Sequence, residues 1–166
     1  KEDLDFCRGL DTWRDKLEMC LIDLAFMFKI PTFGICRGLQ MLNVARKGSL
    51  YPDIPAFVPG SLVHQDSLGD VYHMVQVDRH SELFRITGTA ETTVNSSHHQ
   101  AIREPGEDLI TVASGPDGII EAIELSGSKV HPFFMAVQWH PERMEFENPL
   151  SGLLGKAFVE AAGTVM

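Results

Sequence analysis

The chain is poor in cysteine, contains no cluster of basic residues and has no long apolar run. Its three cysteines, Cys7, Cys20 and Cys36, form no close pair, which argues against a disulfide framework and a Cys-x-x-Cys zinc site. This usage is typical of a reducing compartment, so we expect a cytoplasmic protein. A net charge of −9 without a basic patch argues against nucleic acid or an anionic membrane as a partner. The apolar runs are too short to span a bilayer.

The most informative motif is a strand-like stretch over 30–35 that runs directly into Cys36 and a helix-like segment. This order is typical of a nucleophile elbow, in which a sharp turn presents the nucleophile at a helix N-terminus. Gly34 and Gly38 are expected to leave room for the turn and for close approach of strand and helix. The helix dipole should favour the thiolate of Cys36. The alternative is a buried core cysteine, which is the commoner fate of a lone thiol.

A second motif lies far along the chain, where an apolar stretch over 133–138 is followed by Trp139, His140, Pro141 and Glu142. A histidine at a strand end sits at the rim of the sheet, where α/β enzymes place their chemistry. His140 and Glu142 are two residues apart, so in extended chain they point to the same side. Glu142 could then orient the ring of His140 while its other nitrogen faces a thiol, which is the logic of a catalytic triad.

Together these motifs resemble the class I glutamine amidotransferase-like superfamily, and within it the gamma-glutamyl-gamma-aminobutyrate hydrolase (peptidase C26) type. The matching segments span nearly the whole chain: 33–44, 48–55, 94–102, 113–124 and 137–142. Arg37 directly after the cysteine and the run His98-His99-Gln100 favour the hydrolase branch over the amidotransferases linked to synthetases. The resemblance implies an α/β fold, three-layered and flavodoxin-like, with a mixed sheet and helices on both faces.

The resemblance also implies roles for individual residues. Cys36 would be the nucleophile, His140 the base and Glu142 its orienter, and the backbone N–H of Arg37 would stabilise the oxyanion. The remaining candidates would bind substrate: Gln40, Ser97, His98, His99 and Gln100. Gln40 could instead be a solvated helix residue, and His98 and His99 could be purely structural. Adjacent histidines face opposite ways in extended chain, so they are a poor metal pair, and no metal site is expected.

The remaining sequence predicts an alternating layout in one domain over residues 1–166, because 166 residues with 44% hydrophobic content can bury one core. Helices are expected over about 13–28 with Thr12 as N-cap, from the elbow to Gly48, and through Leu150 and Phe158, with a helical turn over 81–84. Strands are expected over 72–78, 92–95, 109–113 and 119–125, the last two as a hairpin. Residues 49–70 read as loop. The other histidines are taken as surface or loop residues: His64, His73, His80 and His131.

The sequence reaches its first expected helix without the strands that the resemblance would place before it. Members of the superfamily normally have about three strands of the parallel sheet before this point, and a glycine-rich loop there gives the second oxyanion amide. We therefore expect a sheet that lacks its N-terminal strands and exposes an open edge. A second copy of the chain or a missing N-terminal segment would cover it.

The function that the resemblance implies is hydrolysis of a gamma-glutamyl amide to glutamate and an amine through a thioester. The substrate would be a small molecule and no cofactor would be needed. Two alternatives stay open: a glutaminase domain that delivers ammonia to a synthase partner, and a catalytically silent homologue.

Overall fold

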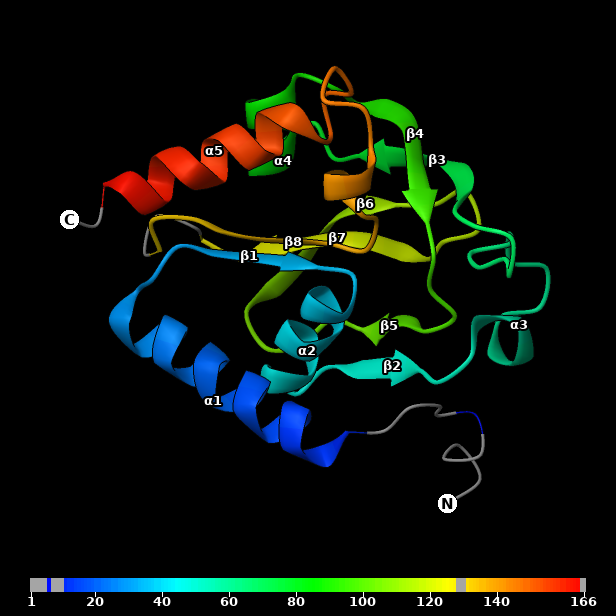
Figure 1. Ribbon diagram of the computed structural model, residues 1–166, viewed down its shortest axis with the longest axis horizontal. Helices are drawn as coiled ribbons and strands as arrows, with labels where there is room; N and C mark the ends of the chain where they lie inside the picture. Colours follow the sequence, from blue (N-terminus) through cyan, green and yellow to red (C-terminus); the bar gives the residue numbers. More distant parts are fainter. Residues whose placement is uncertain (1–5, 7–10, 128–130, 165–166) are drawn as a thin grey trace.

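The computed structural model describes residues 6, 11–127 and 131–164, and within them eight strands form one sheet (Figure 1). Cys7 lies outside the described residues. The strands are β1 (Thr32–Ile35), β2 (Ser49–Tyr51), β3 (Val71–Val77), β4 (Glu91–Ser96), β5 (Ala101–Glu104), β6 (Leu109–Ser114), β7 (Ile120–Leu125) and β8 (Phe134–Val137). The helices are α1 (Thr12–Phe28), α2 (Arg37–Ala45), α3 (Ile54–Phe57), α4 (Glu82–Thr87), the 3₁₀ turn η3 (Pro141–Arg143) and α5 (Gly152–Gly163).

The sheet is mixed, as predicted. Its main path runs β1-β8-β7-β6-β3-β4, with β5 joining β2 to β7. β1 and β8 are parallel, and the other described pairs are antiparallel. β1 is a terminal strand of the path among the described residues, which is the edge that was expected to be open. What covers that edge stays a prediction.

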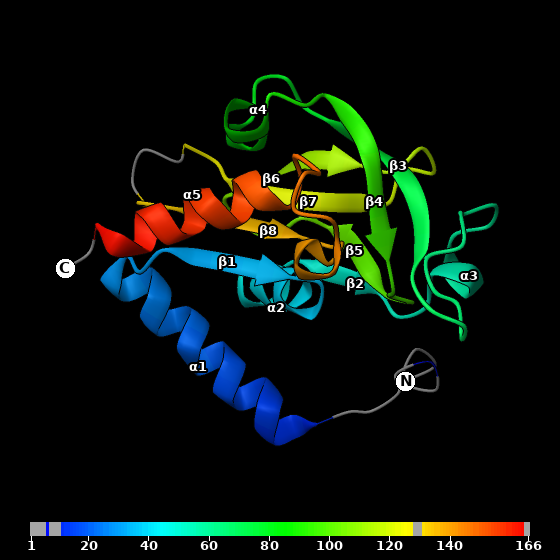
Figure 2. The same cartoon turned by 45° about the horizontal axis from the view of Figure 1, so that its top comes forward.

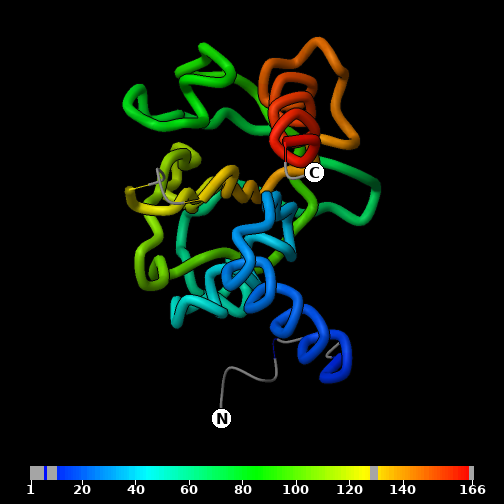
Figure 3. Tube along the Cα trace, turned by 90° about the vertical axis from the view of Figure 1, so that its left-hand side faces the viewer, coloured from blue at the N-terminus to red at the C-terminus, as the bar shows by residue number. Residues whose placement is uncertain are grey.

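Helices cover both faces of the sheet. Successive side chains of β8 point to opposite faces, and all of them are buried. Met135 and Val137 pack into one cluster with Leu154 of α5, while Phe134 and Ala136 pack into a second cluster on the opposite face. Figures 1 and 2 show α4 and α5 over one face and α1 and α2 over the other, and Figure 3 shows α5 and α1 at opposite extremes of the molecule. A strand buried on both faces reads as a continuous apolar run, which is how β8 appears in the sequence.

The first helix was predicted in the right place, but its cap and its packing differ. Asp11, not Thr12, is the N-cap, because its carboxylate accepts from the N–H groups of Trp13 and Arg14. The predicted apolar face lies at the surface, with Trp13 78% and Leu17 55% exposed. No residue of this helix is buried, and Phe26 is among the few that pack against the second cluster.

The segment over 49–70 is not all loop. It contains β2 and α3, and β2 pairs with β5, a strand that the sequence did not indicate. β2 is only three residues long and prolines follow it, so periodicity gave no signal. The hairpin of β6 and β7 was predicted correctly, as were β3, β4 and α4 to within a few residues. Within the described ranges, no helix has the length and apolar character needed to cross a bilayer.

Candidate active site

Cys36 occupies the sharp turn between β1 and α2, as the elbow motif predicts. Its backbone has φ 49° and ψ −103°, a positive φ that non-glycine residues rarely adopt. Strain of this kind gathers at functional sites, where the surrounding structure maintains it. The Cys36 N–H donates to Val137 O at 2.8 Å, which extends the pairing of β1 and β8 up to the turn.

The two glycines of the elbow have different roles. A Cβ on Gly34 would lie 2.6 Å from Leu42 Cδ1 and 2.9 Å from Ala136 Cβ, so this glycine permits close approach of α2 to the strand. A Cβ on Gly38 would meet nothing within 4 Å. The prediction is therefore confirmed for Gly34 and wrong for Gly38 within the described structure.

The sulfur of Cys36 lies beside a short chain of amide groups. Gln138, which is fully buried, donates from Nε2 to Sγ at 3.4 Å and accepts from Gln40 Nε2 at 3.1 Å. Gln40 Nε2 also contacts Gln100 O at 3.0 Å. Gln40 is therefore buried rather than solvated. Gln138 was not singled out from the sequence, although it lies in the same motif as His140.

Burial raises the pKa of the Cys36 thiol. The backbone N–H of Arg37, the charge of Arg143 and the Gln138 amide lower it, while Glu121 raises it further. The net direction is opposite to the thiolate expected from the helix dipole alone. The physical reason is that desolvation of the charged form outweighs one helix N-terminus. The thiol is favoured near neutral pH, so a base is needed to activate it.

His140 and Glu142 form a directed pair just beyond β8. His140 Nδ1 lies 2.7 Å from Glu142 Oε1, so Nε2 is the ring nitrogen that Glu142 does not engage. The predicted pairing is present, but Glu142 reaches the ring from the 3₁₀ turn η3 and not from extended chain. The His140 N–H donates to Asn95 Oδ1 at 2.9 Å, and Asn95 Nδ2 donates to Asp70. Asn95 thereby holds the backbone of His140, a role that the sequence did not reveal.

The substrate-binding candidates gather around one cavity of about 430 Å³. Its lining includes Cys36, Arg37, Gln40 and the segment 97–100, together with Asp11, Arg14 and Asp15 near the start of α1. The acidic residues of α1 were not anticipated. His140 and Glu142 are not part of this lining. Within the described residues Gln138 donates a side-chain hydrogen bond to the Cys36 sulfur, and no direct bond joins the sulfur to His140.

The side chains of Arg37 and the two adjacent histidines are held by protein groups. The Arg37 guanidinium pairs with Asp15 and Glu18 of α1. His98 is buried, and desolvation lowers its pKa to about 4. His99 is partly exposed, with Nδ1 3.5 Å from an oxygen of Asp53. The two rings thus have different partners, as their adjacency predicts.

The expectation for two of the other histidines was wrong. His64 and His73 are buried, and with His98 and Glu121 they form a cluster of possible metal ligands. His80 is exposed and His131 half-buried. His73 alternates with the buried Val75 and Val77 along β3, so strand periodicity could have placed its side chain inside. His64 lies outside any strand or helix, so only the fold shows that it is buried.

The mixed sheet, with an elbow cysteine at the end of one parallel strand and a histidine beyond its neighbour, defines a class I glutamine amidotransferase-like protein. The glutaminase domain of Trypanosoma brucei CTPS with bound acivicin shares this fold at a TM-score of 0.66 and 18% identity, over 94% of this chain and 69% of that one. The peptidase C26 family profile matches residues 7–142, so the chain belongs to that family.

Individual relatives agree with this assignment. Gamma-glutamyl-gamma-aminobutyrate hydrolase PuuD of Escherichia coli K12 is 36% identical over 159 residues, which cover 91% of this chain and 61% of the relative. Protein NtpR of Enterococcus hirae is 35% identical over 150 residues, which cover 89% and 62%. The chain therefore spans less than two thirds of these relatives.

Proposed function

We propose that this chain carries the nucleophile and base of a cysteine hydrolase that cleaves gamma-glutamyl amides to glutamate and an amine. The observation that carries the proposal is the strained Cys36 in the lining of a cavity that Gln40 and the segment 97–100 also line. Membership of the peptidase C26 family and the hydrolase names of relatives support the same chemistry. A cytoplasmic location, expected from cysteine usage, belongs to the proposal.

The first half of the reaction forms a thioester. Cys36 Sγ attacks the side-chain amide carbon of the glutamyl group, and the thiol proton passes to Nε2 of His140. Glu142, bound to Nδ1, stabilises the imidazolium. The negative charge on the former carbonyl oxygen is stabilised by the backbone N–H of Arg37, and loss of one such donor costs about 100- to 1000-fold in rate. The C–N bond then breaks, and His140 returns the proton to the departing amine.

The second half of the reaction releases glutamate. Water attacks the thioester carbon while His140 accepts one of its protons, and the carbon–sulfur bond breaks. The proton returns to the sulfur, which restores the thiol that burial favours. For the first step, His140 must come within reach of the sulfur, where Gln138 lies in the described structure. Hydrogen bonds of this kind often tighten only when substrate is bound.

A glutaminase domain that delivers ammonia to a synthase partner is the second candidate. The fold similarity to a CTPS glutaminase domain keeps this function open. The two differ in leaving group, because a glutaminase releases ammonia and a hydrolase of this type releases a larger amine.

A substrate panel on the full-length protein tests the proposal. Glutamate release is measured from gamma-glutamyl-gamma-aminobutyrate, gamma-glutamyl derivatives of other amines, and glutamine, with Cys36→Ala as the blank. The proposal expects turnover of the larger amides that disappears in the Cys36→Ala protein. Turnover of glutamine alone favours the glutaminase. If no substrate of the panel shows turnover that depends on Cys36, the protein is a catalytically silent homologue.

A further inference from the structure

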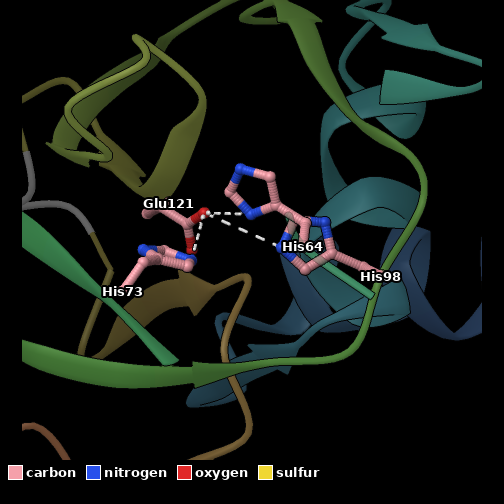
Figure 4. A group of neighbouring side chains, drawn as sticks. All are labelled: His64, His73, His98 and Glu121. Atoms are coloured by element: carbon pink, nitrogen blue, oxygen red, sulfur yellow. Dashed lines mark ion pairs between the residues drawn. The ribbon is translucent and has the colours of Figure 1, made fainter. Parts of the chain in front are cut away.

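Four buried side chains from distant parts of the sequence converge at one point (Figure 4), and one of them, His98, also lines the active-site cavity. His64 precedes β3, His73 lies on β3, His98 follows β4 and Glu121 lies on β7. Their side chains are at most 4% exposed. One oxygen of Glu121 lies 3.6 Å from His64 Nδ1, 3.5 Å from His73 Nε2 and 3.7 Å from His98 Nε2.

In each ring, the nitrogen that faces away from Glu121 is within hydrogen-bond distance of an acceptor oxygen. His73 Nδ1 lies 3.0 Å from Met74 O, and His98 Nδ1 lies 2.9 Å from Gln100 O. His64 Nε2 lies 2.9 Å from Asp117 Oδ2. The same oxygen, Asp117 Oδ2, also accepts from the backbone N–H of Leu62 at 2.9 Å, so it acts as an acceptor.

These bonds fix where the ring protons are. A neutral imidazole has one N–H and one lone pair, so an outward N–H leaves a lone pair on the inward nitrogen. In the neutral form of these rings, which is the form that binds metal, the inward nitrogens of His64, His73 and His98 therefore all present lone pairs to Glu121. The Ser96 hydroxyl, which is also near His64 Nδ1, donates to the backbone oxygen of His64 at 2.9 Å and so supplies no proton to the ring.

The centre of the cluster thus contains acceptors and lacks donors. His73 Nε2, His98 Nε2 and both oxygens of Glu121 have no hydrogen-bond partner among the described residues. Buried polar atoms without partners are rare and destabilising. A single proton on the Glu121 carboxylate could join only one of the three pairs. A cation at the centre would satisfy all of them.

We propose that His64, His73, His98 and Glu121 bind one divalent transition metal ion, with zinc as the best match to three imidazoles and a carboxylate. Ligand atoms around tetrahedral zinc are about 3.4 Å apart, given bonds of about 2.1 Å. The three contacts to Glu121 are close to that spacing, and the four ligand atoms all lie within 4.8 Å of one another. Outward ring bonds to carbonyl or carboxylate oxygens are the usual support of metal-bound histidine.

The ion would stabilise the wall of the active-site cavity. Four protein ligands make a closed site, which is the structural type of zinc centre. His98 belongs to the cavity lining, and Gln100 O receives contacts from both His98 and Gln40. His64 and His98 also line a second cavity, of about 570 Å³. The inference does not depend on the proposed function, because it concerns binding and not turnover.

The test is zinc binding by the full-length protein without tag histidines. Its cysteines are first alkylated, so that thiols cannot bind metal, and it is dialysed against a chelator. Zinc is then titrated, with bound metal measured by elemental analysis and the midpoint of thermal unfolding, Tm, measured alongside. His73→Ala and Glu121→Gln remove one ligand each, and His80→Ala is the matched control outside the cluster.

We expect one zinc per chain and a Tm that rises with zinc in the parent and in His80→Ala. His73→Ala and Glu121→Gln should lose tight binding and the rise in Tm. If either variant fails to fold, cobalt bound to the parent gives the decisive readout, namely a visible spectrum of tetrahedral nitrogen and oxygen ligation that zinc abolishes. The inference is overturned if the parent binds no zinc, if cobalt shows no such spectrum, or if folded ligand variants bind zinc as the parent does.

Discussion

Ile35 lies opposite Val137 in the parallel pair of β1 and β8, so both strands end at the same edge of the sheet. The next residue on one side is Cys36, and on the other the chain continues through Gln138 to His140. This register brings residues from the two ends of the sequence to one site. It also explains why Gln138, and not His140, is the immediate neighbour of the Cys36 sulfur.

The first prediction concerns the ionisation of Cys36. Because burial raises its pKa above the ordinary thiol value of about 8.5, little thiolate is present at pH 7. The rate of alkylation of Cys36 by iodoacetamide should rise with pH and continue to rise through pH of about 9. Mass spectrometry of the Cys36 peptide measures this rate, and the exposed Cys20 in the same sample is the internal reference. A rate that levels off at or below pH 7 would show a preformed thiolate.

The second prediction concerns the base and its orienter. His140→Ala should lower kcat by about 100- to 10,000-fold, which is the usual contribution of a general acid–base group. Glu142→Gln should cost less, because it keeps a group that can bond to Nδ1 and removes only the charge. Steady-state kinetics on the best gamma-glutamyl amide of the panel measures both. Parent-like activity in His140→Ala would place the base elsewhere, with His98 or His99 next.

The third prediction concerns Asn95, which is fully buried and holds the backbone N–H of His140. Asn95→Ala should lower kcat by up to about 100-fold, because misplacement of a catalytic group by about 1 Å has this effect. KM should change less, since Asn95 is not part of the cavity lining. Asn148→Ala is the control, because Asn148 also binds backbone groups but not those of His140. Equal kcat values in the two variants would show that Asn95 does not position His140.

The sequence predicts the parts of this protein that depend on local signals. The elbow at Cys36 and the buried strand ending before His140 are readable because turn, apolar run and motif lie within a few residues of each other. The cluster around Glu121 was missed, because its ligands come from four separate segments and no spacing joins them. The predicted lowering of the Cys36 pKa was wrong for a related reason. The helix dipole is a local property, whereas desolvation depends on everything packed around the sulfur.

The last prediction separates the two glycines of the elbow by stability. Gly34→Ala should destabilise the fold by about 1–3 kcal/mol, because the added methyl overlaps Leu42 and Ala136 and the packed core cannot yield without shifts. Gly38→Ala should be neutral or stabilising by up to about 1 kcal/mol, because its methyl enters open space and alanine favours the helix.

Urea unfolding of both variants measures the difference, with the parent as reference. Each protein carries one added methyl group within the same strand–helix unit, Gly34 in β1 and Gly38 in α2. The free energy of unfolding should therefore differ between the two variants even though their sequences differ only in the position of the methyl. If Gly34→Ala is as stable as Gly38→Ala, then α2 can move away from β1 at little cost. The tight approach at Gly34 would then contribute little to the stability of the fold.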